Sequence, residues 1–229
     1  MKFLRHLPCP RCGSKDNLGE YDDHFFCFGC KYYKTKDDIT SIKLRRAQKE
    51  PTDLRNTQIE TTEDIPINAK QWLFQYGIKP SEIKDFGISW NEEHELLVLL
   101  KTPSYWQART FGKHKVKYMS SGQKPLTFYG YSDKLVCVED ILSAIKISRL
   151  SPEWCALPLL GSHLMENVSE RLGRDFSSVV IWLDRDKAKD AIQIAKNLKQ
   201  RGINSSVVIS PKDPKEYNEG EITEWLRNK

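Results

Sequence analysis

Four cysteines near the N-terminus have the types and spacing of a metal site. Cys9-Pro-Arg-Cys12 and Cys27-Phe-Gly-Cys30 form two Cys-x-x-Cys knuckles separated by 14 residues. Each knuckle can present two thiolates from one tight turn, and four thiolates satisfy tetrahedral zinc. Gly13 is expected to relieve the backbone after the first knuckle. Because protein ligands fill all four positions, we expect a structural zinc ion and a catalytic centre elsewhere.

Carboxylates recur at the ends of apolar segments in the C-terminal half. Glu139 follows Leu-Val-Cys-Val, Asp184 and Asp186 follow the apolar segment 178–183, and Asp213 follows the segment 205–210. Neighbouring carboxylates repel one another, so a shared cation is favourable. One or two magnesium or manganese ions held there would activate an attacking oxygen and stabilise a leaving one. A second explanation is that Asp184 and Asp186 cap the helix that follows them.

The elements that must position these acids alternate between strand and helix. The sequence predicts helices over 140–150, 164–172 and 187–201, and strands over 135–138, 154–160, 178–183 and 205–210. Continuously apolar strands separated by helices indicate a mainly parallel sheet covered on both faces. The last helix is expected to end at Gly202 and to bury one apolar face, made of Ala188, Ala191, Ile192, Ala195 and Leu198. Cys137 and Cys155 are expected to be small core residues.

A basic segment precedes this region. The pattern predicts a short helix over 69–76, capped by Asn68 and ended by Gly77, and strands over 96–101 and 105–111 joined by a turn at 102–104. No acidic residue occurs between Glu95 and Asp133. The basic residues in that interval are Lys101, Arg109, Lys113, Lys115, Lys117 and Lys124. Such a patch attracts phosphates, although a solvated basic loop has the same composition.

The cysteine module also carries an aromatic segment before its second knuckle. This segment contains Asp22, His24 and Phe26 among further aromatic residues. Exposed aromatic rings stack on unpaired bases, and Asp and His side chains bond base edges. The alternative is that these rings form the small core of a purely structural module.

Composition and charge exclude several classes of protein. The 229-residue chain is 39% hydrophobic, has a net charge of +5, and contains no run of 18 apolar residues, so no membrane span is expected. The apolar stretch at the N-terminus is too short for a secretory signal peptide. We therefore expect a cytoplasmic protein, located in the host cytoplasm if the protein is viral. The expected organisation is a zinc ribbon (1–35), a flexible tether (36–63) with a short helix at 39–48, a mixed α+β basic subdomain (64–132) and an α/β catalytic subdomain (133–229).

Taken together, these motifs resemble those of DnaG-type primases. Glu139, the Asp184-Arg185-Asp186 pair and Lys212-Asp213-Pro214 resemble the acidic motifs of the Toprim fold. The Cys-Pro-x-Cys-Gly ribbon and the segment from Arg109 to Tyr118 are similar to the parts that precede Toprim in these primases. The likeness looks strongest to the primase half of bacteriophage primase–helicases, including the positions of Asp22 and His24, which in that family help to read the template.

The resemblance implies a role for each matching residue. Glu139, Asp184 and Asp186 would hold magnesium or manganese, with Glu139 also assisting deprotonation of the attacking 3′-hydroxyl. Lys212 and Asp213 would support the site, and Arg109 and Lys117, with the neighbouring Lys113, Lys115 and Tyr118, would grip nucleotide phosphates or template. The chain departs from the family where Glu-Gly-x-x-Asp reads Glu139-Asp140-Ile-Leu-Ser143, so that Asp140 replaces the glycine and Ser143 the second acid.

The resemblance implies a primase that makes short RNA primers on single-stranded DNA from ribonucleoside triphosphates. No Gly-x-x-x-x-Gly-Lys-Ser/Thr phosphate loop is present, so we expect a separate replicative helicase as a partner and no membrane association. Two alternatives remain open at this point. One is a non-catalytic DNA-binding mediator of the RecR kind, and the other is a Toprim nuclease.

Overall fold

The computed structural model describes residues 2–36, 58–164, 166–227 and 229, and the chain divides into two compact units, Met1–Leu54 and Arg55–Lys229. The helix expected at 39–48 and most of the expected tether lie outside the described residues. Residues 58–63, also expected in the tether, pack on the second unit: Ile59 is buried, and Thr62 forms a β-bridge with Trp90. In the described part of the chain, no helix has the length and apolar character needed to cross a membrane.

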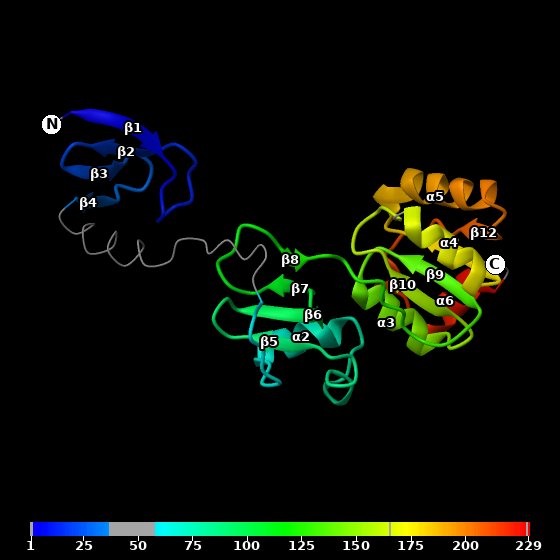
Figure 1. Cartoon of the computed structure of the whole chain (residues 1–229). Coiled ribbons are helices and arrows are strands. Elements are labelled where there is room, and N and C mark those ends of the chain that lie inside the picture. Colours follow the sequence, from blue (N-terminus) through cyan, green and yellow to red (C-terminus); the bar gives the residue numbers. More distant parts are fainter. Residues whose placement is uncertain (1, 37–57, 165, 228) are drawn as a thin grey trace. The chain divides into compact units, whose positions relative to one another are not determined.

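The first unit is a small antiparallel sheet with strand order β1-β2-β3-β4 (Figure 1). The strands are Phe3–Leu7, Leu18–Tyr21, His24–Cys27 and Tyr33–Thr35. Its core cluster is made of Cys9, Leu18 and Cys27. A core of this size supplies little apolar burial, so a metal ion held by the cysteines would add stability that the core lacks.

The two knuckles have the same backbone turn. The amide of Gly13 donates to the carbonyl of Cys9 at 3.0 Å, and the amide of Lys31 donates to that of Cys27 at 3.0 Å. Both residues after the turns have left-handed backbones, with φ of 72° at Gly13 and 58° at Lys31. Glycine takes this conformation freely, whereas lysine does so at a cost that the turn must offset. The role predicted for Gly13 is therefore confirmed.

The second unit begins with an antiparallel sheet of order β5-β6-β7-β8. Its strands are Ser89–Asn91, Leu96–Thr102, Tyr105–Thr110 and Tyr118–Gly122. The predicted strands and their turn are confirmed as β6 and β7, while β5 and β8 were not predicted. Helix α2, Ile67–Gln75, begins two residues earlier than predicted, and Pro66 occupies the N-cap position that the sequence had suggested for Asn68. Gly77, with φ of 77°, follows its C-terminus as predicted.

A four-stranded parallel sheet follows, with strand order β10-β9-β11-β12. Its strands are Lys134–Val138 (β9), Cys155–Pro158 (β10), Ser178–Trp182 (β11) and Ser205–Val207 (β12). All four coincide with predicted strands, so the predicted parallel sheet is confirmed. Cys137 and Cys155 are buried in it, as expected.

The helices of this region are α3 (Ile141–Leu150), α4 (Glu166–Asp175), α5 (Ala188–Gln200) and α6 (Glu219–Leu226). The first three were predicted and the last was not. In α5, the buried residues Ala191, Ala195 and Leu198 agree with the predicted apolar face. Ile192 does not, because it is 51% exposed and lies at the edge of that face.

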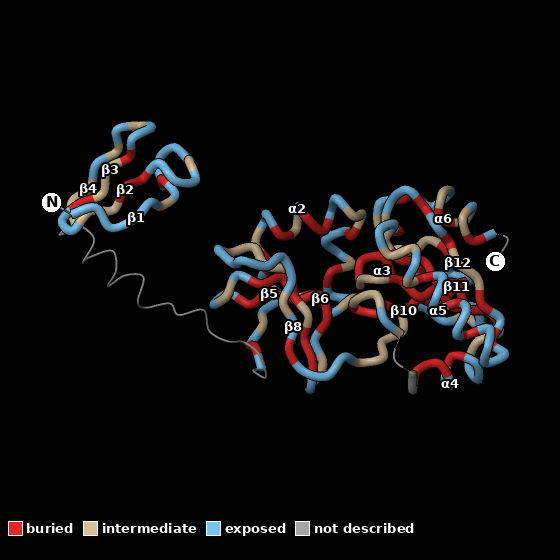
Figure 2. Tube along the Cα trace, turned by 90° about the horizontal axis from the view of Figure 1, so that it is seen from above, coloured by how far each residue is buried: buried red, intermediate tan, exposed pale blue. Residues whose placement is uncertain are grey.

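The side chains of each strand point alternately to the two faces of the sheet, and these helices cover both faces (Figure 1). Leu135 and Cys137 of β9 belong to the cluster that packs on α4 and α5. Val136 and Val138 belong to the cluster that packs on α3 and α6. The strands are therefore buried from both sides, as the continuous red of β10 and β11 in Figure 2 shows.

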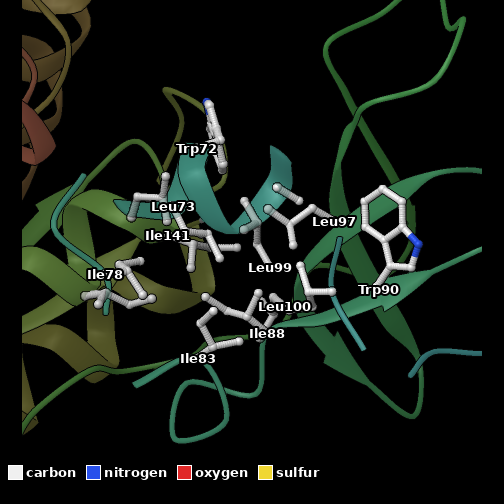
Figure 3. Packing of buried hydrophobic residues seen from close by; sticks show 14 of the residues in the cluster. Trp72, Leu73, Ile78, Ile83, Ile88, Trp90, Leu97, Leu99, Leu100 and Ile141 are labelled. Atoms are coloured by element: carbon white, nitrogen blue, oxygen red, sulfur yellow. The ribbon is translucent and has the colours of Figure 1, made fainter. Parts of the chain in front are cut away.

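A shared core joins the two sheets of the second unit. Leu73 of α2 and Leu97 of β6 lie in the same cluster as Ile141 and Ile145 of α3, and Figure 3 shows Ile141 beside Leu73. The Arg149 guanidinium at the end of α3 adds a polar contact. It donates to the Gly77 carbonyl at 2.7 Å and to the Glu82 carboxylate at 2.9 Å. These contacts join the two sheets within the second compact unit.

Truncation of Leu73 tests this shared core. Leu73 is fully buried, so Leu73→Ala should lower the free energy of unfolding of the second unit by about 2–5 kcal/mol. All six tryptophans lie between 72 and 225, so tryptophan fluorescence during urea unfolding reports on this unit alone. Ile192→Ala, at an exposed position, should change stability by less than about 1 kcal/mol. A biphasic transition in wild-type protein would show that the two sheets unfold separately.

Candidate active site and zinc site

The four knuckle cysteines have the geometry of a tetrahedral zinc site. Their Sγ atoms all lie within 4.8 Å of one another, with 3.7 Å between Cys9 and Cys30 and 3.8 Å between Cys12 and Cys27. Zinc–sulfur bonds of about 2.3 Å place tetrahedral sulfur atoms about 3.8 Å apart. Hydrogen bonds with Ser14 lower the pKa of Cys12 to about 6, whereas burial raises the pKa of Cys30 to about 12, so the fit to zinc rests on the positions of the sulfur atoms. The predicted zinc ligands therefore fit the metal.

The predicted acids gather at the carboxyl end of the parallel sheet. The chain leaves β9 to form β10 on one side, and β11 lies on the other side of β9. The carboxyl ends of β9 and β11 therefore flank the point where strand order reverses, which is where open α/β sheets bind ligands. Glu139 directly follows β9, and Asp184 lies two residues beyond the end of β11.

Glu139 and Asp184 each carry a buried carboxylate oxygen that has no hydrogen-bond partner, Oε2 and Oδ1 respectively. Burial, and then the charges of Asp186 and Asp140, raise the pKa of Glu139 above its ordinary value. Burial also raises the pKa of Asp184 to about 7, with Asp213, Glu139 and Asp140 adding to the effect against the opposing charge of Lys215. These mutual effects place the acids in one electrostatic site.

The side chain of Asp184 does not cap a helix. Residues Arg185–Lys187 form a 3₁₀ turn (η2) before α5, and the Asp184 carboxylate makes no capping hydrogen bond to it. Asp186 lies within this turn, is 75% exposed at its side chain, and is 3.5 Å from the Lys187 ammonium. The capping explanation therefore fails for Asp184, whose buried oxygen remains available to a ligand.

Asp140 and Asp213 meet at a lysine that sequence reasoning had missed. Lys215 Nζ lies 2.9 Å from Asp140 Oδ2 and 2.9 Å from Asp213 Oδ2. Asp140 also caps α3 by accepting hydrogen bonds from the Ser143 amide at 3.0 Å and the Ser143 hydroxyl at 2.9 Å. The signal in the sequence was the spacing Asp213-Pro214-Lys215, because the proline opens a 3₁₀ turn (η3, Pro214–Glu216) that carries the lysine.

Lys212, expected to support the acids, has a different environment. Its ammonium lies 5.6 Å from the centre of the Tyr217 ring, and its amide donates to the Tyr217 hydroxyl at 3.1 Å. Tyr217 packs within the core beside Trp182, whose indole nitrogen donates to Ser210 at 2.7 Å. These contacts hold Lys212 against Tyr217 in the loop after β12. The described contacts with the acids come from Lys215 instead.

Arg109 lies among aromatic rings on β7. Its guanidinium carbon is 4.4 Å from the ring centre of Trp72, and 5.7 Å from those of Phe111 and Tyr118. Burial raises the pKa of Tyr118, and the charges of Arg109, Asp140 and Lys215 also act on its hydroxyl. Tyr118 therefore lies within electrostatic reach of both the basic strand and the acidic site.

The remaining basic residues have more open positions. Lys113, Lys115 and Lys117 are exposed between β7 and β8. Lys124 Nζ donates to the Leu160 carbonyl at 2.6 Å, beyond the carboxyl end of β10. Lys101 donates to the Ile59 carbonyl at 2.7 Å, on the segment that was expected to be tether.

In the first unit, the three ribbon residues selected from the sequence differ in exposure. His24 is buried at 6% exposure, because its ring stacks on Tyr21 at 4.5 Å and on Tyr33 at 5.0 Å, and its Nδ1 lies 2.7 Å from Asp23 Oδ1. Asp22 is exposed, and its Oδ1 accepts a hydrogen bond from the Lys2 amide. Phe26 is half-buried against the edge of Phe28.

The donors of the acidic site suit a hard divalent cation. Magnesium and manganese prefer carboxylate oxygens, and the site offers two buried ones without partners on Glu139 and Asp184, with Asp186 nearby. Among the described residues, only the four cysteines form a group of three or more potential metal ligands within 4.8 Å of one another. No three of the described carboxylates lie as close together. The donors that remain available to a cation are therefore the buried oxygens of Glu139 and Asp184.

No protein-family model and no curated protein matches this sequence. Solved structures do match its fold. The zinc-binding and RNA polymerase domains of the Aquifex aeolicus primase align with 99% of this chain and 80% of their own, at 15% identity and a TM-score of 0.56. The DnaG primase catalytic domain bound to single-stranded DNA aligns with 72% of this chain and 73% of its own, at 16% identity and a TM-score of 0.57. The Escherichia coli primase catalytic core aligns with 70% of this chain and 71% of its own, at 15% identity and a TM-score of 0.55. At these identities the likeness establishes the fold: a zinc-ribbon-like module followed by a primase-like core.

Serine substitution of Cys27 tests the zinc site. Cys27→Ser should reduce bound zinc from one ion per chain to nearly none and unfold the first unit, because the metal replaces a hydrophobic core there. Elemental analysis after dialysis measures the zinc. Cys155→Ser removes a buried thiol outside the knuckles and should leave zinc content unchanged. Full zinc in Cys27→Ser protein would refute this ligand set.

Asparagine substitution of Asp184 tests the raised pKa of this carboxyl group. Its folded-state pKa of about 7 exceeds its ordinary value of 3.8, so folding favours the protonated form and stability is lost as pH rises through about 7. Asp184→Asn should therefore raise the melting temperature at pH 8, by roughly 2–4 °C, and have little effect near pH 4. Asp85→Asn, at an exposed position, controls for loss of a negative charge. Equal melting curves for wild type and Asp184→Asn at pH 8 would contradict this assignment.

Proposed function

We propose that this chain is a template-directed RNA primase with a Toprim-type catalytic subdomain, of the kind found in bacteriophage primase–helicases. The observation that carries the proposal is the pair of buried, unpartnered oxygens on Glu139 and Asp184 at the switch point of a sheet in a primase-like fold. Arg109, whose guanidinium lies over the Trp72 ring, supplies positive charge for phosphates, and Tyr118 beside it lies within electrostatic reach of Asp140 and Lys215.

The acids and the basic strand have complementary tasks in the proposed reaction. Glu139, Asp184 and Asp186 hold magnesium or manganese, which, when bound, neutralises phosphate charge and makes the 3′-hydroxyl more acidic. In this proposal Glu139 also helps to accept the proton of that hydroxyl. The 3′-oxygen of one nucleotide forms a bond to the α-phosphorus of the next, and the bond from that phosphorus to pyrophosphate breaks. Arg109, Lys113, Lys115 and Lys117 hold the triphosphate and the template, so positioning and charge supply most of the catalysis.

The zinc ribbon is proposed to contact the single-stranded template. Its exposed rings are Phe3, Phe28 and Tyr33, with exposed fractions of 45%, 49% and 57%. Such rings stack on unpaired bases, and Asp22 is exposed to bond a base edge. His24 contributes by fixing the orientation of Tyr33, on which it stacks. In this proposal a separate helicase supplies the unwound DNA.

A priming assay with Glu139→Gln tests this proposal. Wild-type protein incubated with single-stranded DNA, labelled ribonucleotides and magnesium should make short labelled oligomers. Glu139→Gln should lose at least about 100-fold in this synthesis while keeping its fold, because it loses charge at the reacting centre. Glu153→Gln, at an exposed position, is the matched control.

The products separate the proposed function from its rivals. Shortened DNA in place of labelled oligomers would indicate a nuclease that uses the same acids. DNA binding without either product would indicate a mediator. Undiminished synthesis by Glu139→Gln would remove this residue from the mechanism.

A further inference from the structure

The carboxylates of the acidic site fall into two groups that differ in their partners. Glu139 and Asp184 form the open group, because each has a buried oxygen without a hydrogen-bond partner. Asp140 and Asp213 form the closed group, because the Lys215 ammonium lies 2.9 Å from an oxygen of each. The structure thus already supplies a cation to half of the site.

Asp140 has little capacity left for a metal ion. Its Oδ1 accepts the Ser143 amide, and its Oδ2 accepts both the Ser143 hydroxyl and the Lys215 ammonium. Ser143 is fully buried, so these bonds are protected from water. A divalent ion at Asp140 would have to displace the lysine.

Lys215 is held in place and stays charged. Its side chain is 14% exposed, and it extends from the short turn that Pro214 begins. Although burial opposes its charge, Asp140 and Asp213 raise the pKa of Lys215 above its ordinary value. The ammonium is therefore present at every pH at which the enzyme would work.

We propose that the Lys215 ammonium is a built-in cation that takes the place of a second divalent ion, so that this site binds one ion, at Glu139 and Asp184, and not two. A second dication between Asp140 and Asp213 would meet the lysine ammonium, which lies 2.9 Å from an oxygen of each, and like charges at this range repel strongly. This inference rests on the proposed function only in taking a divalent ion as the cofactor.

Counting bound manganese tests the proposal without any catalytic assay. Zinc-loaded full-length protein is titrated with Mn²⁺, and free Mn²⁺ is measured by its electron paramagnetic resonance signal. Wild type should bind one ion per chain. Lys215→Met keeps the length of the side chain but removes its charge, so it should bind two. Lys215→Arg keeps the charge and should bind one.

Two further variants locate the ions. The double variant Lys215→Met with Asp213→Asn should return to one ion, because it removes a carboxylate from the new site. Lys196→Met, at an exposed position on α5, should match the wild type. Near-ultraviolet circular dichroism checks that each variant is folded.

Two ions in wild-type protein, or a single ion in folded Lys215→Met, would overturn the proposal. The wild-type count needs no variant, so a variant that fails to fold does not leave the question open. One ion in a protein that makes no primers would refute the primase proposal and support this one. A protein that makes primers and binds two ions would support the primase proposal and refute this one.

Discussion

The main physical constraint on the second unit is that it buries carboxylates at a cost in free energy. Two parallel strands end side by side, and each delivers a carboxylate into a partly buried site in which one oxygen has no donor, on Glu139 and on Asp184. Folding therefore works against the ionisation of these groups, as the raised pKa values of both show. Such an arrangement persists only if the surrounding fold compensates for it. Here the compensation comes from the apolar clusters on both faces of the sheet and from the core shared by α2 and α3. A bound cation would relieve the same strain, which links stability to function.

The two metal-related sites have opposite relations to folding. In the ribbon, the four cysteines lie where a larger domain would have a hydrophobic core, and a metal ion bound to them would help to hold the sheet together. In the acidic site, the sheet is already stabilised by its core, and the acids reduce that stability. Lys215 pairs with Asp140 and Asp213 but leaves one buried oxygen of Glu139 and one of Asp184 without a hydrogen-bond partner.

Periodicity in the sequence was sufficient for most of the parallel sheet, because β10 and β11 are buried along their whole length and α3, α4 and α5 have ten residues or more. It did not reveal α6, which has only eight residues. It was insufficient for β5 and β8, which are short and carry polar residues, and for α2, whose start is set by Pro66. The cysteine spacing and the strand-end acids were recognisable because each depends on local order along the chain. Lys215 was not, since its role depends on a turn that brings it against Asp140, 75 residues away. Burial of His24 between two tyrosines is likewise a consequence of strand pairing that no local pattern contains.

Manganese located directly in crystals is the most direct test of the claim that Glu139 and Asp184 form a cation site. Crystals soaked in Mn²⁺ give an anomalous difference map in which bound manganese appears as a discrete peak. The account predicts a peak bonded to Glu139 Oε2 and Asp184 Oδ1, the two buried oxygens without a partner. A map with no peak at these oxygens, or with manganese bound only at other carboxylates, would contradict it.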